Sequence, residues 1–324
     1  MAYGGINMEY RKIISFGKSS FVVSLPKSWV VQNKLQKGDV VYFEEDNNNL
    51  VLQPRRETTG DEEKEIVIDV DGKTTPWLTR EICTAYVQNY RKIVLRGKEV
   101  KNKVKELQSL IQGMIALEIM EQTSDTIIAK DFLNMDKVSL NELVRKMDIV
   151  TRTMFKECCQ IFTEDTYESL NERDRDVNRL YFLLYRAVLY NLDNPTKSMK
   201  NFSLRAVDLL KLKMTGMYLE IIADEVRRVA RYVRMLKISP AERKNIEVFL
   251  ERVNDNFLQT MKSYYNKDIK LALELAEVKK NLEEELDVWE KDVAKINHLN
   301  QVINRLRRLI VGVHNVGRLV YTLI

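Results

Sequence analysis

The first 54 residues predict a β-rich module that is too small to bury a hydrophobic core by itself. Its expected elements are a basic strand at 10–14, a turn at 16–20, an apolar segment at 21–25, a Lys-Gly-Asp turn at 37–39, and strands at 40–44 and 50–54 around an Asp-Asn-Asn-Asn turn. About 45 residues in four short strands supply little apolar area for a core. We therefore expect this module to pair with a second copy of itself, as a dimeric, cation-rich element attached to a larger and different body.

Composition places the whole chain among ordinary globular proteins with room for two or three domains. It has 324 residues, of which 45% are hydrophobic and 31% charged. No apolar run approaches the roughly 18 residues of a membrane span, and no signal-peptide pattern is present, which predicts a cytoplasmic protein. Three unpatterned cysteines indicate free thiols in a reducing compartment. The formal net charge of +5 is small for this size, so the local distribution of charge decides which partners are plausible.

After an acidic linker, the chain predicts a small α/β section and then helices only. The expected elements of the α/β section are strands at 65–70, 92–95 and 126–129 and helices at 76–89 and 102–113. From Ser139 onward, apolar residues recur at helical spacing. Two series with seven-residue steps, 90 positions apart, are Leu212, Leu219, Val226 and Val233, and Val302, Leu309, Val316 and Leu323. Each series follows two other amphipathic helices, which predicts an internal duplication with a break at Ser239-Pro240.

The expected fold is thus multidomain α+β. Its parts are a β module at 1–56, a connecting α/β section at 57–135, and tandem three-helix bundles at 136–238 and 239–324.

The motif content argues against an enzyme. The sequence has two histidines and lacks the glycine-rich nucleotide loops, the GxSxG elbow and the HExxH zinc helix. What remains is a set of acidic residues four positions apart on helices: Glu220 with Asp224, Glu283 with Asp287, and Asp174 with the weaker partner Asn178.

Two interpretations of these acidic pairs stay open. Carboxylates four residues apart lie on one helix face, where they could share a divalent or trivalent cation such as iron, zinc, manganese or magnesium. They could equally belong to a salt-bridge ladder, because Arg227 and Arg228 follow Asp224 at the favourable three- and four-residue spacings. The ladder is favoured more strongly for Glu283 and Asp287, which have three lysines close by in the sequence.

The N-terminal module resembles the AbrB (SpoVT-AbrB) swapped-hairpin family. The similarity lies in the basic first strand, the Leu-Pro-Lys-Ser-Trp start of a short helix at 25–29, the Lys-Gly-Asp turn at 37–39 and the closing Leu-Val-Leu-Gln-Pro at 50–54. The resemblance implies a DNA-binding dimer in which two chains interleave their hairpins into one barrel. The positions that would face DNA are Arg11, Lys12, Lys18 and Lys27, with Ser19 and Ser20 as phosphate contacts. The alternative is that these cations only solvate an edge strand. The usual arginine of the short helix is absent around 27–29, so a sequence preference does not carry over.

The helical part resembles the PhoU family of phosphate-uptake regulators, which consist of two three-helix repeats. Leu-Glu-Ile-Ile-Ala-Asp at 219–224 is similar to the family's Leu-Glu-Arg-Ile-Gly-Asp signature, and Asp-Arg-Asp-Val-Asn at 174–178 is similar to its preceding acidic motif. Glu283 to Asp287 occupies the equivalent place in the second repeat, where Ile310 and His314 replace the signature acids. The resemblance implies metal binding by Glu220, Asp224 and Asp174, and by Glu283 and Asp287.

An AbrB-like head on a PhoU-like body is similar to archaeal phosphate-uptake regulators. The resemblance implies a homodimeric transcription regulator whose head binds DNA and whose body senses phosphate status through a metal, a ligand or a transporter subunit. The alternative is an adaptor that contacts the ATPase subunit of a phosphate transporter and uses the head only to dimerise. A nucleoid-organising protein indifferent to phosphate is a third possibility.

Overall fold

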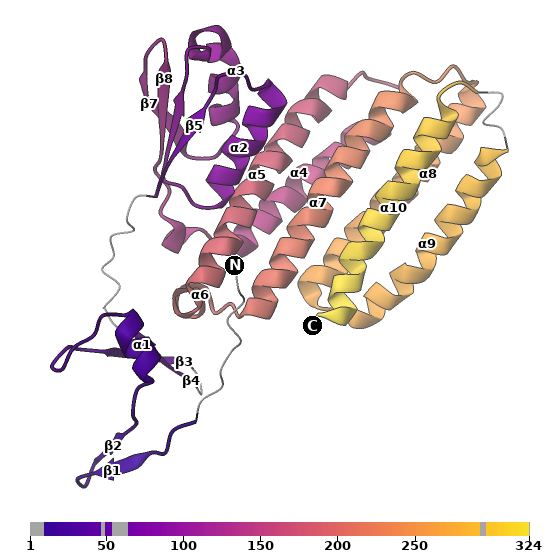
Figure 1. The fold of residues 1–324 in the computed structure, drawn as a ribbon. Coiled ribbons are helices and arrows are strands. Elements are labelled where there is room, and N and C mark those ends of the chain that lie inside the picture. Colours follow the sequence, from indigo (N-terminus) through magenta and orange to yellow (C-terminus); the bar gives the residue numbers. More distant parts are fainter. Residues whose placement is uncertain (1–9, 47–48, 54–63, 292–295, 324) are drawn as a thin grey trace. The chain divides into compact units, whose positions relative to one another are not determined.

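The computed structural model describes residues 10–46, 49–53, 64–291 and 296–323. The chain divides into two compact units, Met1–Glu62 and Glu63–Ile324. The first unit holds two hairpins and a short helix, and the second holds a mixed sheet and the long helices (Figure 1). The finer division at 56, 135 and 238 stays a prediction.

The N-terminal unit consists of two separate antiparallel hairpins. Strand β1 (Ile14–Phe16) pairs with β2 (Ser20–Val22), and β3 (Tyr42–Asp46) pairs with β4 (Asn49–Gln53). Helix α1 (Lys27–Gln32) lies between the hairpins in sequence. Among the described residues, the hairpins share no ladder, so each is a two-stranded sheet. The predicted pattern of four strands is confirmed, while closure into a barrel is a property of two chains and stays a prediction.

The first strand lies further along the chain than the sequence suggests. The sequence predicts it at 10–14 and the structure has it at Ile14–Phe16. The ladder begins at Ile14, which pairs with Val22, the last residue of β2, so the residues before Ile14 have no partner in β2. Residues 47–48 of the predicted turn and 54–56 of the module's end lie outside the described residues.

The second unit begins with an α/β section built on a four-stranded sheet. Its elements are β5 (Glu65–Asp69), α2 (Thr75–Val87), β6 (Lys92–Arg96), α3 (Val100–Gln112), β7 (Leu117–Gln122) and β8 (Thr126–Asp131). The strand order is β5-β6-β8-β7, and only β5 and β6 run parallel. Helices α2 and α3 share one hydrophobic core with the sheet, and α5 packs against that core through Phe182, Tyr185 and Leu189.

The remaining chain is helical. Its elements are a 3-10 turn at Met135–Lys137, α4 (Leu140–Cys159), α5 (Tyr167–Asp193), α6 (Pro195–Phe202), α7 (Ala206–Val233), α8 (Pro240–Asn266), α9 (Ile269–Glu290) and α10 (Leu299–Thr322). Side-chain caps fix several starts. The Ser239 hydroxyl accepts a hydrogen bond from the Glu242 N–H, and the Glu242 carboxylate accepts one from the Ser239 N–H, which forms a capping box at the predicted break. None of the helices in the described ranges is long and apolar enough to cross a membrane.

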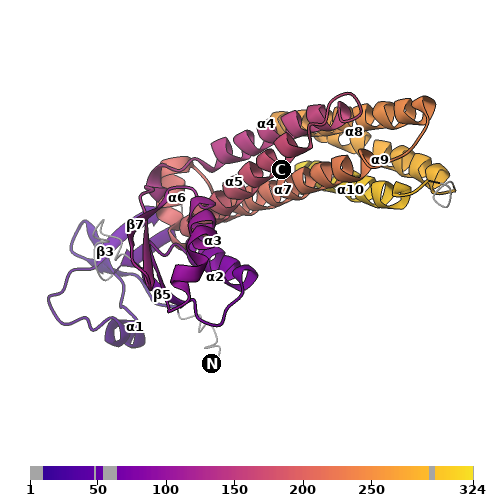
Figure 2. The ribbon, with the colours of Figure 1, turned by 90° about the horizontal axis from the view of Figure 1, so that it is seen from above.

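The six long helices form two groups of three that share one core. Helices α4, α5 and α7 contact one another, as do α8, α9 and α10, and the groups meet along α7 with α10 and α4 with α8. In Figure 2, the group of α4, α5 and α7 lies beside the group of α8, α9 and α10. A single buried cluster runs through all six helices and includes every residue of the two seven-residue series except Leu323. Glycines allow the close approaches: a Cβ on Gly216 would collide with Leu184 of α5, and one on Gly312 would lie 3.0 Å from Ile222 of α7.

A buried charge cluster joins α5 to the α/β section. The side chains of Arg186 on α5 and Asp131 at the end of β8 are both inaccessible to solvent, and the Arg186 Nη2 lies 2.7 Å from the Asp131 Oδ2. The Arg186 Nε and Nη2 donate hydrogen bonds to the Asn89 Oδ1 at 2.9 and 2.7 Å. The guanidinium also lies over the Tyr86 ring, 4.7 Å from its centroid. The Arg186 guanidinium is therefore engaged by an ion pair with Asp131, two hydrogen bonds to Asn89 and a cation–π contact with Tyr86.

Candidate functional site

The N-terminal unit leaves its apolar side chains in solvent. None of its described residues whose side-chain burial is known is buried. Phe16 is 71% exposed, Phe21 75% and Ile13 72%, and nine further large apolar side chains of the unit are also exposed. Such a concentration of exposed aromatic and β-branched residues is typical of a surface that another protein covers.

The predicted DNA-contacting residues lie at three places along this unit. Arg11 and Lys12 precede β1, Lys18 and Ser19 lie in the turn between β1 and β2, Ser20 is the first residue of β2, and Lys27 is the first residue of α1. All six are exposed. Gly17 opens the turn with a φ of +71°, a conformation that glycine adopts without steric cost, and so the hairpin tip presents Lys18.

The hairpin geometry separates these cations rather than gathering them. At about 3.3 Å per residue, the five steps from Lys12 to Gly17 span roughly 16 Å. Arg11 and Lys12 therefore lie near the open end of the hairpin, and Lys18 lies at its tip. One chain presents a spaced series of cations, which suits the regularly spaced phosphates of a nucleic-acid backbone better than a single anion.

Local structure explains why α1 begins at Lys27. Pro26 has a φ of −59°, which its ring imposes, and stands immediately before the first helical residue. At the other end, the Asn33 side chain donates a hydrogen bond to the Trp29 carbonyl at 2.8 Å. Trp29 is half-buried while Lys27 is exposed, so the helix turns its cation outward. The start of a short helix at this Leu-Pro-Lys-Ser-Trp segment is confirmed.

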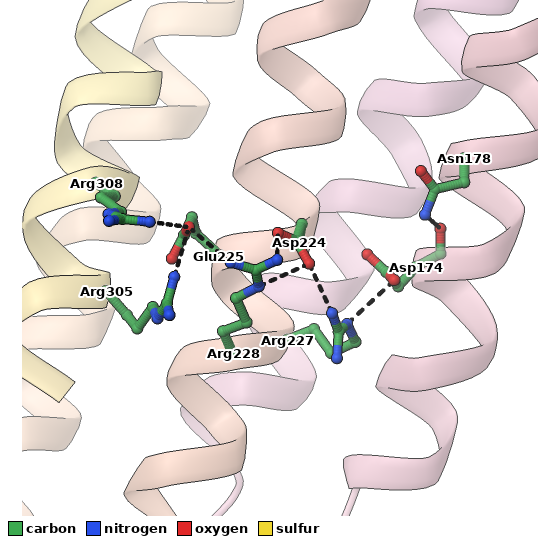
Figure 3. A network of polar contacts seen from close by, with 8 residues as sticks. All are labelled: Asp174, Asn178, Asp224, Glu225, Arg227, Arg228, Arg305 and Arg308. Atoms are coloured by element: carbon green, nitrogen blue, oxygen red, sulfur yellow. Dashed lines mark hydrogen bonds and ion pairs between the residues drawn. The ribbon is translucent and has the colours of Figure 1, made fainter. Parts of the chain in front are cut away.

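In the helical region, the structure brings Asp174 of α5 and Asp224 of α7 together around an arginine (Figure 3). The Arg227 Nη2 lies 2.6 Å from the Asp224 Oδ1, and its Nε lies 3.1 Å from the Asp174 Oδ2, close enough for an ion pair although not aligned as a hydrogen bond. Arg228 contacts both oxygens of Asp224, at 3.0 and 2.8 Å. Both oxygens of Asp224 therefore already face guanidinium groups, as the salt-bridge interpretation expects.

Glu220 lies one turn before Asp224 and differs from it in having no ion-pair partner among the described residues. Burial raises the pKa of Glu220 to about 7, and the nearby charges of Asp224 and Asp174 add to the effect. The Asn178 amide is engaged by its own helix, because it donates to the Asp174 carbonyl at 3.0 Å.

These contacts bear on whether a metal fits. Glu220 offers a free carboxyl, but a cation bound by Asp224 would have to displace Arg227 or Arg228. Within the described residues, no group of three or more acidic, histidine or cysteine side chains is arranged to hold a metal ion. Metal binding at Glu220, Asp224 and Asp174 stays a prediction.

Replacing Glu220 by glutamine tests the electrostatic part of this arrangement in chelator-treated, metal-free protein. A carboxyl whose folded-state pKa is raised binds more protons when folded, so its contribution to stability is present below about pH 4.5 and is lost as pH rises towards 7. We expect Glu220→Gln to flatten the fall in stability over this window and to stabilise the protein at pH 8 by about 1–2 kcal/mol, allowing for solvent screening. Urea unfolding at pH 5 and pH 8 measures both effects. A variant less stable than the parent at pH 8 would contradict the expectation.

The predicted second acidic pair is divided between different partners. Glu283 lies 3.4 Å from the Lys279 Nζ on its own helix, and Asp287 lies 2.6 Å from the Arg307 Nη2 of α10. Asp287 is largely exposed. Arg307 also contacts Glu290 at 2.9 Å. The salt-bridge interpretation therefore describes the contacts of this pair in the structure.

Sequence reasoning missed Glu225, which links the two groups of helices. Its side chain is 5% exposed, and its Oε1 lies 3.2 Å from the Arg305 Nη1 of α10 and 3.9 Å from that of Arg308 (Figure 3). Burial raises the pKa of Glu225, and Arg305 opposes this shift. Glu225 and Arg305 are 80 positions apart in the sequence, so no local spacing could have predicted their contact. The sequence feature that could have indicated this role is that Glu225 lies on an otherwise apolar face of its helix.

Comparison with known families finds a match for the N-terminal unit. Residues 14–59 match the family described as antidote-toxin recognition MazE, bacterial antitoxin, which belongs to the AbrB-like swapped-hairpin class. The match supports the predicted AbrB-like N-terminal domain and includes Lys18, Ser19 and Lys27, while Arg11 and Lys12 precede it. No match is found among curated proteins or among solved structures. The likeness of the helical region to PhoU stays a prediction.

Proposed function

We propose that this protein is a homodimeric DNA-binding regulator whose N-terminal units pair to form the DNA-binding head. The observation that carries the proposal is the match of residues 14–59 to a class of swapped-hairpin domains. Two properties of the unit agree with it. Its exposed apolar residues need a partner surface, and its exposed cations, Lys18 and Lys27 among them, are spaced along the chain. We also propose that the protein acts in the cytoplasm and catalyses no reaction.

The salt dependence of DNA binding tests the role of the cations. Replacing Lys18 by alanine is expected to weaken binding and to reduce the slope of log K against log salt by about 0.9 for each phosphate that the protein no longer neutralises, which is about 1.8 for a symmetric dimer. Fluorescence anisotropy over a series of salt concentrations measures the slope. Lys280→Ala is the matched control, because Lys280 is 77% exposed on α9 and pairs with Glu284. Equal slopes for the parent and Lys18→Ala would remove Lys18 from the interface.

For the helical region, we propose that it senses phosphate status through a metal, a ligand or a transporter subunit. The support is the signature-like segment at 219–224 and the placement of Glu220 beside Asp224 and Asp174. Promoter occupancy measured in cells at high and low phosphate tests the signal, and occupancy that ignores phosphate would exclude it. Elemental analysis of the purified protein tests the metal, and a preparation without iron, zinc, manganese or magnesium would assign the carboxylates to ion pairing.

An antitoxin function is the second candidate, favoured by the description of the matched family. An antitoxin would bind a toxin as well as DNA. Co-purification from native cells, combined with promoter occupancy, separates the candidates. A small toxic protein as partner supports the antitoxin, and a phosphate-transporter ATPase without promoter occupancy supports the adaptor. Promoter occupancy without either partner supports the regulator.

A further inference from the structure

A cavity at the end of the helical region where the chain terminates is lined by more cations than carboxylates. Its volume is about 650 Å³, within the range of small-molecule sites. It lies between the start of α4, the start of α7, the end of α8 and the residue after α10. Four of its lining side chains are cationic, Arg145, Arg205, Lys211 and Lys267, and two are carboxylates, Glu142 and Asp208.

One of the two carboxylates is already used. Asp208 lies 3.1 Å from the Arg205 Nε and accepts a hydrogen bond from the Arg205 N–H, which caps α7. Among the residues that the structure describes, no carboxylate forms an ion pair with Arg145, Lys211 or Lys267. Three cations therefore line one cavity without an ion-pair partner from the described part of the protein.

The surroundings of Lys211 disfavour its charged form, and the backbone of Lys267 adopts a conformation that lysine rarely takes. Lys211 is half-buried, and burial together with the like charge of Lys267 lowers its pKa. Lys267 ends α8 in the left-handed conformation, with a φ of 54°, which glycine adopts more readily than lysine. Burial and the charge of Lys267 therefore disfavour the charge of Lys211 in the empty protein, and the charge of Asp208 offsets this only in part.

Two adjacent tyrosines that line the cavity contact two of its cations. The Lys211 Nζ lies 5.1 Å from the centroid of the Tyr264 ring, and the Arg145 Cζ lies 5.6 Å from that of the Tyr265 ring. Cation–π contacts favour the charged forms and leave the N–H groups able to donate elsewhere. The apolar lining residues Val144, Leu204 and Leu212 would contact an organic part of a ligand.

We propose that this cavity binds a small phosphorylated molecule, with Lys211, Lys267 and Arg145 contacting its phosphoryl oxygens. Several cations around one cavity suit a group that carries at least two negative charges and several acceptor oxygens. The concave shape admits a small molecule and excludes a duplex. The inference concerns a site separate from the N-terminal unit and does not depend on DNA binding.

Calorimetric titration of the full chain without DNA tests the site, with inorganic phosphate, pyrophosphate and ATP as probes at constant ionic strength. We expect saturable binding, weakened at least about tenfold by Lys211→Met, since that substitution removes a hydrogen bond to a charged group. Lys270→Met is the control and should bind as the parent does, because Lys270 is 88% exposed and pairs with Glu274. Tighter binding of ATP or pyrophosphate than of phosphate identifies an organic or polyphosphate ligand. Binding of inorganic phosphate alone would overturn the assignment to a phosphorylated molecule and would identify the free ion as the ligand.

The stability of the ligand-free variant separates a binding role from a packing role. If Lys211 is held for a ligand, Lys211→Met should raise the thermal midpoint of the empty protein while it weakens binding, because a desolvated and repelled charge is removed. A lower midpoint together with abolished binding would show that Lys211 supports the fold and would overturn the assignment. Failure of all three probes to bind, or equally weakened binding in Lys211→Met and Lys270→Met, would overturn it too.

Discussion

In the proposed DNA-binding dimer, replacing Phe21 by aspartate is expected to convert dimer to monomer and to abolish DNA binding. Phe21 is the middle residue of β2 and is 75% exposed in the single chain. Burying a phenylalanine contributes about 1.5–3 kcal/mol, and a symmetric dimer contains the residue twice. A charge in its place should therefore raise the dimer dissociation constant at least about a hundredfold. Light scattering coupled to size-exclusion chromatography measures the mass, and a gel-shift assay measures DNA binding.

Val288→Asp is the matched control for the added charge. Val288 is 57% exposed on α9, in the other unit, so the same substitution there should leave mass and DNA binding unchanged. If Phe21→Asp remains a dimer at micromolar concentration, the N-terminal unit is not the dimer interface. Loss of DNA binding with the dimer intact would instead place Phe21 at the DNA surface.

Replacing Arg186 by methionine is expected to cost about 3–5 kcal/mol of the free energy of unfolding of the second unit. The substitution leaves the carboxylate of Asp131 fully buried, with Arg91 at 3.2 Å as its remaining ion-pair partner in the described residues. It also removes both hydrogen bonds to Asn89. Urea unfolding followed by far-ultraviolet circular dichroism measures the decrease.

The double variant Arg186→Met/Asp131→Leu tests whether the loss of stability comes from the buried carboxylate that Arg186→Met leaves behind. Replacing a buried ion pair by apolar residues of similar size is often neutral, so the double variant should recover much of the stability. A decrease below about 1 kcal/mol in Arg186→Met would mean that solvent reaches the carboxylate, contrary to its burial. A double variant less stable than Arg186→Met would show that the cluster contributes through its hydrogen bonds to Asn89.

Much of the fold follows from periodicity in the sequence, and the exceptions have physical reasons. The seven-residue series locate α7 and α10 because their apolar residues, apart from Leu323, all face one core. Strand β7 was missed, since its polar side chains alternate poorly with apolar ones and its residues 120–122 are exposed. Helix α6 was also missed, because it has only eight residues and begins at Pro195, and a proline between helices is usually taken to mark a turn.

The candidate sites were predictable in residue type but not in contacts. Arg227 and Arg228 could be assigned to Asp224 because the spacing of three and four residues makes them neighbours on a helix. The ion pair of Arg227 with Asp174 depends on how α7 packs against α5, which no local pattern encodes. The same holds for Arg186 with Asp131, 55 positions apart. In the N-terminal unit, the sequence could not predict which cations lie close together, because in the proposed dimer this depends on contacts with a second chain.

No side chain of the N-terminal unit whose burial is known is buried, and this affects how the number of protein copies in a cell influences regulation. If pairing supplies the core of the head, the fraction of chains competent for DNA binding depends on how many copies a cell contains. At low copy number, the concentration of paired heads rises with the square of the chain concentration. A modest change in synthesis or degradation would then produce a larger change in promoter occupancy, so the gene's own expression level becomes an input to the regulation.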